Sequence, residues 1–392
     1  MKKTFLYVFC ILVLLLGCTR TEGSKNSNGA NENKEFGNDA TIITFNGSAA
    51  EIAGNGAEFL DKTLTIKQSG KYILSGRLEN GQVFVNAGNN AVVQIVLNGV
   101  SIRNETGPAI LSQGDGELAI ILESRTRNTV SRNYHLSTLN KRNAVIFIQD
   151  HLRISGDGSL EVSEAYNGIR ARGSLTISGG SFDIQVQNKG ILSDSAVFIT
   201  GGSINIADSN EGIEGRTVTI SGGNIKVFAR DDGLNASGSS RLDDMFIRIS
   251  GGTLDVTALG DGIDSNGNIF LEGGTVKVSG PSLANASAID LDGQFVVSGG
   301  ELITAGSIQS VSPSTTQPVI LVSYTRENAL GSLIAVKNSD GDTLLEYTSG
   351  TAFSSSGFTS PSFKIGETYF LFINNEKRAD IRLNNITTRI GI

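Results

Sequence analysis

The chain of 392 residues has no tryptophan, 2 cysteines and 2 histidines. Both cysteines, Cys10 and Cys18, lie near its start, so the rest of the chain can form no disulfide, thiolate metal site or cysteine nucleophile. Basic residues are also scarce, because 32 lysines and arginines face 39 aspartates and glutamates, for a formal net charge of −7. Nucleic acid is therefore not an expected partner.

Glycine, by contrast, is abundant at 48 residues, and part of it is periodic. Between Gly168 and Gly300 one phrase recurs about every 22 residues: a glycine followed by Ile or Leu, a few polar residues, an alternating segment, a Gly-Gly pair and a second alternating segment. The first glycine of the phrase falls at Gly168, Gly190, Gly212, Gly233 and Gly262. A short fixed period indicates a solenoid, because one repeat cannot bury its apolar face alone.

Within each repeat the pattern predicts strands. Leu175 and Ile177 flank the polar Thr176, which is the period of a strand with one buried face. Three short strands per repeat fit a parallel β-helix, with Gly-Gly at a corner because glycine takes left-handed dihedrals without strain. We expect two apolar columns to stack inward: Ile177, Ile199, Ile220, Ile249, Leu271 and Val297, and beside them Ile169, Ile191, Ile213, Leu234, Ile263 and Ile289.

The start of the chain predicts export. Lys2 and Lys3 precede an apolar run over residues 5–16, which is too short to span a membrane, and Gly17 precedes Cys18. Residues 1–17 resemble a bacterial lipoprotein signal, with a buried core helix as the alternative. The resemblance implies acylation of Cys18 and attachment through lipid to the bacterial cell envelope, at the outer membrane or cell surface.

The remaining chain divides into three expected parts. Residues 18–40 are polar and predict a flexible tether, and residues 41–310 form the solenoid. The repeat ends near residue 310, and 311–392 contain strand runs and an Asp340-Gly341 hairpin turn. We expect this last part to be a small antiparallel β module that covers the open end of the solenoid, where strand edges are otherwise exposed.

The order of several phrases makes the chain recognisable. Strand-rich segments at 72–76, 92–102, 118–122 and 152–160 precede the Asn-Gly-Ile and Asp-Asp-Gly-Leu repeats and a Gly-Glu-Thr-Tyr hairpin at 366–369. Over roughly residues 60–375, this order resembles a bacterial cell-surface carbohydrate-binding family. The resemblance implies an all-β fold, a right-handed parallel β-helix shaped like pectate lyases, together with calcium and plant-type or acidic polysaccharides.

Polar side chains gather on both sides of the repeated glycine. The residue before it forms a corner column, Asn167, Lys189, Glu211, Asp232 and Asp261, and the residue two places after it forms an outer column, Arg170, Leu192, Glu214, Asn235, Asp264 and Asp290. We call the two columns together the ridge.

Successive coils of the ridge carry carboxylates about 5 Å apart, which repel by roughly 3 kcal/mol at an effective dielectric near 20. Calcium accepts such irregular oxygen ligands. The predicted ligands are Glu211, Glu214, Asp231, Asp232, Asp261, Asp264 and Asp290, and a solvated acidic face is the alternative.

Basic residues interrupt the acidic pattern and suggest the ligand. Arginine binds sugar carboxylates through two N–H groups, whereas neutral-sugar modules usually stack the sugar on tryptophan or tyrosine. We therefore expect an acidic, uronate-containing polysaccharide, with solvated arginines as the alternative. The candidate binding residues are Arg170, Arg172, Lys189, Arg216 and, as an aromatic platform beside the ridge, Tyr166.

The repetition of the acids favours binding over catalysis, because a glycoside hydrolase needs one tuned pair of carboxylates. We predict a lipid-anchored, calcium-dependent binder of acidic polysaccharide that is not an enzyme. Two alternatives stay open. A polysaccharide lyase would use an arginine or lysine of the ridge as its base, and a structural or adhesive surface protein would bind no glycan.

Overall fold

The computed structural model describes residues 40–114, 116–132, 142–238, 244–281 and 286–392. The fold is all-β, and the described ranges contain no α-helix. The predicted signal (1–17), Cys18 and the tether (18–40) lie outside these ranges, except for residue 40. No helix in the described part of the chain is long and apolar enough to cross a membrane.

Most strands belong to two sheets that wind around one core. The 11-stranded sheet contains β3 (Ala57–Leu60), β4 (Thr63–Ile66), β6 (Gln82–Val85), β8 (Ile110–Ser112), β11 (Ala144–Ile148), β14 (Asn167–Ala171), β17 (Lys189–Ser193), β20 (Glu211–Gly215), β23 (Leu234–Ala236), β25 (Ile263–Ser265) and β27 (Ile289–Leu291).

The 20-stranded sheet bends around the rest of each coil. It contains β1 (Thr41–Gly47), β2 (Ala49–Ala53), β5 (Gly70–Leu78), β7 (Val93–Asn104), β9 (Leu118–Leu122), β10 (Arg127–Arg132), β12 (Leu152–Gly156), β13 (Ser159–Ala165), β15 (Leu175–Ile177), β16 (Ser181–Val186), β18 (Ala196–Ile199), β19 (Ser203–Ser209), β21 (Thr217–Ile220), β22 (Asn224–Ala229), β24 (Phe246–Ala258), β26 (Asn268–Ser279), β28 (Phe295–Ala305), β29 (Val319–Asn328), β32 (Phe353–Thr359) and β35 (Thr387–Gly391).

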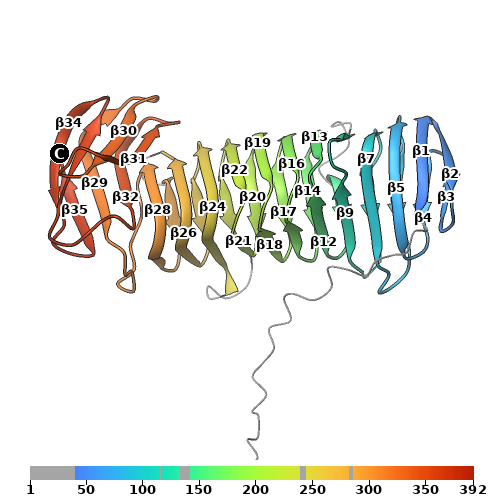
Figure 1. The fold of residues 1–392 in the computed structure, drawn as a ribbon, viewed down its shortest axis with the longest axis horizontal. Helices are drawn as coiled ribbons and strands as arrows, with labels where there is room; N and C mark the ends of the chain where they lie inside the picture. Colours follow the sequence, from blue (N-terminus) through green and yellow to red (C-terminus); the bar gives the residue numbers. More distant parts are fainter. Residues whose placement is uncertain (1–39, 115, 133–141, 239–243, 282–285) are drawn as a thin grey trace, which may run out of the picture. The chain divides into compact units, whose positions relative to one another are not determined.

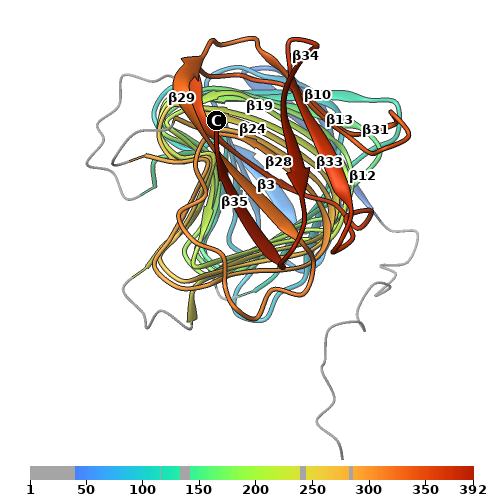
Figure 2. The same ribbon diagram turned by 90° about the vertical axis from the view of Figure 1, so that its left-hand side faces the viewer.

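Successive coils lie side by side in chain order, as the run of colours in Figure 1 shows. Seen along the stack, coils of different colours superimpose (Figure 2). Strands of neighbouring coils pair in parallel, for example β17 with β20 and β18 with β21. The predicted all-β parallel β-helix is therefore confirmed.

Both predicted inward columns are confirmed. Ile177 aligns with Ile199, and the alignment continues to Val297 through β21, β24 and β26. Ile169 aligns with Ile191, and that column continues to Ile289. These side chains are buried and belong to one hydrophobic cluster that runs through the solenoid.

The Gly-Gly pairs form the bend of the 20-stranded sheet, and their two glycines meet different constraints. The second glycine has a positive φ, +91° at Gly202 and +92° at Gly223, which side chains rarely adopt. The first glycine packs against the preceding coil, because a Cβ at Gly201 would lie 2.6 Å from the carbonyl oxygen of Ser178. Neither position of the pair therefore accepts a side chain without strain.

The last coils pass this bend without a break. The middle coils have separate strands on either side of it, such as β15 and β16, whereas β24, β26 and β28 continue through it as single strands of 13, 12 and 11 residues. Their register shifts at the glycines, between Ile249 and Thr253 in β24.

Antiparallel pairs terminate both ends of the solenoid. At the first coil β1 pairs with β2 and β3 pairs with β4, an arrangement that the sequence did not indicate. At the last coil β28 pairs with β32, which in turn pairs with β29. The expected C-terminal module is present as a separate four-stranded antiparallel sheet, β31 (Thr343–Thr348), β30 (Leu333–Lys337), β33 (Thr368–Ile373) and β34 (Glu376–Arg382), with its own hydrophobic cluster.

Candidate functional site

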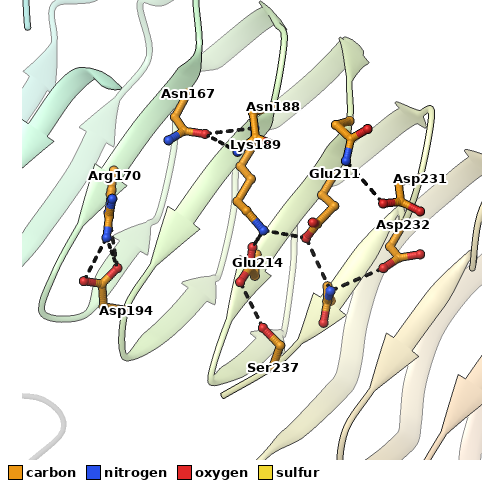
Figure 3. A network of polar contacts seen from close by, with 12 residues as sticks. Asn167, Arg170, Asn188, Lys189, Asp194, Glu211, Glu214, Asp231, Asp232 and Ser237 are labelled. Carbon is orange, nitrogen blue, oxygen red and sulfur yellow. Dashed lines mark hydrogen bonds and ion pairs between the residues drawn. The ribbon is translucent and has the colours of Figure 1, made fainter. Parts of the chain in front are cut away.

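The ridge lies where the strands of the 11-stranded sheet begin, and its outer column is in register from coil to coil. Arg170 aligns with Leu192, Leu192 with Glu214, and the column continues through Asn235 and Asp264 to Asp290. Alternation along each short strand turns these side chains away from the inward isoleucines. Figure 3 shows the first four coils of the ridge.

Lys189 neutralises the first acidic coil. Its Nζ lies 2.8 Å from Oε2 of Glu211 and also contacts Oε2 of Glu214 (Figure 3). All three side chains are largely buried, with 19%, 13% and 16% of their side-chain surface exposed. An ammonium group of the chain thus occupies the position between two glutamates where the sequence predicted calcium.

Arg170 is paired in the same way with a residue that the sequence analysis did not single out, Asp194. Its Nη2 lies 2.8 Å from Oδ1 and 3.1 Å from Oδ2 of Asp194, and its guanidinium lies 5.7 Å from the centre of the Phe147 ring. Arg172 reaches the same carboxylate through Nε, at 3.3 Å. Two predicted sugar-binding arginines therefore converge on one carboxylate of the chain itself.

The two other predicted binding residues have fewer contacts. Arg216 is exposed, and the structure shows no ion pair for it among the described residues. Tyr166 is half-buried in the bend between β13 and β14, where its carbonyl accepts a hydrogen bond from the Asn188 amide at 2.7 Å.

The aspartates of the next coils have no cation of the chain beside them in the described contacts. Asp232 accepts a hydrogen bond from the Asp261 amide at 2.9 Å, and Asp261 accepts one from the Ser287 amide at 2.6 Å. Asp231 is exposed and accepts a hydrogen bond from Nδ2 of Asn210 at 3.2 Å. Backbone amides, hydroxyls and amide side chains are neutral donors, so the negative charge accumulates.

Burial and mutual repulsion shift the acidity of this group. Burial, with neighbouring carboxylates led by Asp232, raises the pKa of Asp264 to about 7. Burial also raises the pKa of Asp232 to about 6, against the lowering effect of its backbone hydrogen bond. The pKa of Asp261 is raised for the same first reason, with Asp290 adding to the effect. A proton or a cation would relieve the repulsion.

One oxygen in this group lacks a donor. Nδ2 of Asn235 donates to Glu211 and Asp232, both at 3.3 Å, while Oδ1 of Asn235 is buried and has no hydrogen-bond partner. Buried acceptors are almost always satisfied, so this oxygen suits a cation. In the described ranges, however, no three carboxylate, histidine or cysteine side chains are arranged to hold a metal by themselves.

Toward the N-terminus the outer column continues with apolar instead of polar residues. Phe84, Leu111 and Phe147 align with Arg170 across β6, β8, β11 and β14. Leu111 and Phe147 are buried and form a small apolar cluster with Ala144, packed against Phe84. The sequence analysis missed this continuation because these coils lack the repeated glycine that located the column.

Known proteins resemble the chain in both sequence and fold. The sequence profile of a family described as carbohydrate-binding domain-containing protein matches residues 60–216 and 186–312. A protein of that description from Acetivibrio thermocellus is 29% identical over 132 residues, which cover 32% of this chain and 46% of that protein. The chain thus spans about half the length of this relative.

A solved structure is also similar. It is described as the polysaccharide lyase-like protein from C. thermocellum, in a gadolinium derivative. The TM-score is 0.52 at 26% sequence identity, and the match covers 66% of this chain and 96% of that chain.

Proposed function

Since the chain belongs to the carbohydrate-binding domain-containing protein family, we propose that it binds an acidic polysaccharide along the ridge, with calcium shared between protein and polymer. The observation that carries this proposal is the unsatisfied Oδ1 of Asn235, which lies in one column with Glu214 and Asp264. This oxygen without a donor and the neighbouring carboxylates with raised pKa values would supply part of the coordination of a hard cation. Polymer carboxylates and water would complete the coordination.

The basic end of the ridge supports an acidic polymer. Arg172 and Arg216 are both exposed, and each lies four residues after a repeated glycine, with Asp194 in the same position of the coil between them. The carboxylate of Asp194 already pairs with Arg170 and Arg172, so the charge of Arg216 is left for a uronate of the polymer. Lys189 and Arg170 hold the intervening carboxylates in place, so we assign them a positioning role.

A lyase is the second candidate, favoured by the description of the similar solved structure. Such an enzyme removes a proton next to a sugar carboxylate and needs a basic group that can accept it. Lys189 and Arg170 are tied to carboxylates of the chain itself. Because acids of the chain already occupy these two basic side chains, their arrangement favours binding over proton abstraction.

The decisive experiment is retention of the purified protein on polygalacturonate, with calcium or with a chelator. We expect retention that falls when calcium is removed, and retention that magnesium restores poorly because it demands a tight octahedron. Unsaturated products, detected by ultraviolet absorbance, would establish the lyase instead. Equal retention with calcium and with chelator would contradict the shared cation.

The position of the protein in the cell is part of the same proposal. We propose that Cys18 carries lipid and that the protein is held at the bacterial cell envelope, at the outer membrane or cell surface. The wild-type chain should then fractionate with membranes and incorporate labelled fatty acid, while Cys18→Ser should be soluble and unlabelled. Unlabelled wild-type protein in the soluble fraction would refute the anchor.

A further inference from the structure

A polar hollow of about 440 Å³ lies at the N-terminal end of the 11-stranded sheet, where β4, β6, β8 and β11 begin. Its lining includes Asp61, Lys62, Asn80, Gln82, Asn104 and Arg142. The parallel pairing of β4, β6, β8, β11 and β14 places it on the same corner as Asn167, the first residue of the ridge. The hollow therefore continues the ridge toward the N-terminus.

A buried guanidinium lies beside this hollow. Arg132, at the end of β10, is 2% exposed, and its Cα pairs with that of Asn104. Its Nη1 donates to the carbonyl of Arg142 at 3.1 Å, so two residues that line the hollow are its direct neighbours. Its Nε and Nη2 are buried and have no hydrogen-bond partner.

This arrangement is unfavourable unless something compensates the charge. A buried ion without a partner is strongly unfavourable, and burial lowers the pKa of Arg132 for that reason. The described residues show no carboxylate paired with Arg132. An anion seated at the hollow would supply the missing countercharge.

The walls of the hollow are held rigidly. Asp61 and Lys62 occupy left-handed backbone positions, with φ of 49° and 61°, in the tight turn between β3 and β4. Nε2 of Gln82 and Nδ2 of Asn104 both donate to the carbonyl of Pro108, at 2.7 and 2.8 Å. Lys62 shows no ion pair among the described residues. A fixed site of this kind loses little entropy when it binds.

We propose that the hollow is a binding subsite for a carboxylate of the acidic polysaccharide. Lys62 would contact the sugar, and the buried Arg132 would supply positive charge from beneath the lining residues. The proposal rests on the proposed function, because continuity with the ridge is what favours a sugar carboxylate over a free inorganic anion. On the ridge the charges of Arg170 and Lys189 are already paired with carboxylates of the chain. The hollow offers charge that the chain leaves uncompensated.

The test compares binding and stability in two variants and one control. Lys62→Ala and Arg132→Met should each weaken binding of trigalacturonate, measured by calorimetry, by about tenfold or more. Arg132→Met should also keep or raise the melting temperature of the free protein, because it removes an uncompensated charge while filling the same volume. Lys226→Ala, at an exposed lysine in β22, should change neither quantity.

The possible contrary results distinguish a failure of the proposed function from a failure of the subsite alone. Failure of the wild-type protein to bind trigalacturonate overturns the proposed function and this subsite with it. Wild-type binding that persists in both variants overturns the subsite alone. A lower melting temperature of Arg132→Met with unchanged binding shows a structural arginine. Methyl-esterified trigalacturonate should bind weakly, and stabilisation by sulfate without trigalacturonate binding would show a site for free anions instead.

Discussion

Glu211 and Glu214 differ from the acids of the following coils because a lysine of the preceding coil lies between them. Lys189 is one coil before Glu211 in the corner column, and the two align in the parallel pair of β17 and β20. One coil later, Asn235 replaces a charge with an amide and leaves an unsatisfied oxygen. Single residues thus decide which part of the ridge is neutralised by the chain and which part keeps its negative charge.

Replacing Lys189 with methionine tests the internal neutralisation. Without the ammonium group two largely buried glutamates repel, so Lys189→Met should lower the free energy of unfolding by about 1–3 kcal/mol in calcium-free buffer. Calcium should restore part of the loss, because the variant exposes both glutamates to it. Urea denaturation with and without calcium measures both effects, and Lys226→Met should shift stability by no more than about 0.5 kcal/mol. Unchanged stability of Lys189→Met would show that the glutamates are solvated.

The raised pKa values of Asp264 and Asp232 set a pH dependence. Folding raises these values to about 7 and about 6 from 3.8, so the folded state takes up protons that the unfolded state does not bind. Stability should therefore increase as pH falls through 7 and 6 and should be lower above pH 7. Protons and calcium should compete for the same carboxylates.

Asp264→Asn isolates the contribution of Asp264 to the pH dependence of stability. The variant should melt higher than the wild type near pH 8 without calcium, and the difference should shrink as pH falls below about 6. It should also show a smaller rise in melting temperature with calcium, since a ligand stabilises only by binding the folded state. Asp157→Asn, at an exposed position, is the control. A wild-type melting temperature that is constant from pH 8 to pH 5 would contradict the shifted pKa values.

The sequence predicted the columns because a constant coil length fixes which residues become neighbours. It placed Arg170, Leu192 and Glu214 in one line, which is the register of the strands. It did not reveal that Arg170 and Lys189 bind acids of the chain, because side-chain length and direction decide that pairing. Asp194 was not predicted because it lies four residues after the repeated glycine, outside the two columns. Arg132 lies in a coil without the glycine signal, and its burial is visible only in three dimensions.

Parallel strands one coil apart are the elements on which the ridge is built. The strands that carry the polar residues of the outer column present an inward aliphatic side chain beside an outward polar one, as Ile213 and Glu214 show in β20. The position of a ridge side chain is therefore only as well defined as the packing of its inward neighbour. Loops can vary in length between strands because the pairing itself restores the register.

Substitutions of Ile213 test how far the ridge depends on the packing of the inward side chains. It is fully buried, so Ile213→Ala should cost about 2–5 kcal/mol of stability through lost packing and a cavity. Ile213→Asp places an unpaired charge in the core and should prevent folding, seen as loss of soluble protein and of the strand signal in circular dichroism. Lys226→Asp, on an exposed site, should fold normally. A soluble and cooperative Ile213→Asp variant would contradict the inward stacking.

At the scale of the whole molecule, the C-terminal residues protect the last coil. β28 pairs with β32, the hydroxyl of Ser279 lies 2.8 Å from that of Tyr347, and the Gly350 amide donates to Ser279 at 2.7 Å. The buried Ile303 of β28 belongs to the hydrophobic cluster of the C-terminal sheet. The end of the solenoid is therefore continuous with the module that follows it.

A chain that ends after residue 316 should lose this protection. The edge of β28 and the side chain of Ile303 would be exposed, and free strand edges pair with one another. We expect self-association in size-exclusion chromatography, whereas the full-length chain should elute as a smaller species at the same concentration. A monomeric, stable truncated chain would show that the solenoid needs no cover.

The stacking of coils has a further consequence for any polymer that lies along the ridge. Contacts recur at the spacing of neighbouring strands, about 4.8 Å, and all of them engage one continuous molecule. Once one sugar is held, its neighbours are presented to the next coils at high effective concentration, so contacts that are individually weak combine into tight attachment. The number of contacts that one polymer makes is then set by the number of coils. A long polymer can release one coil and bind again at the next without leaving the surface.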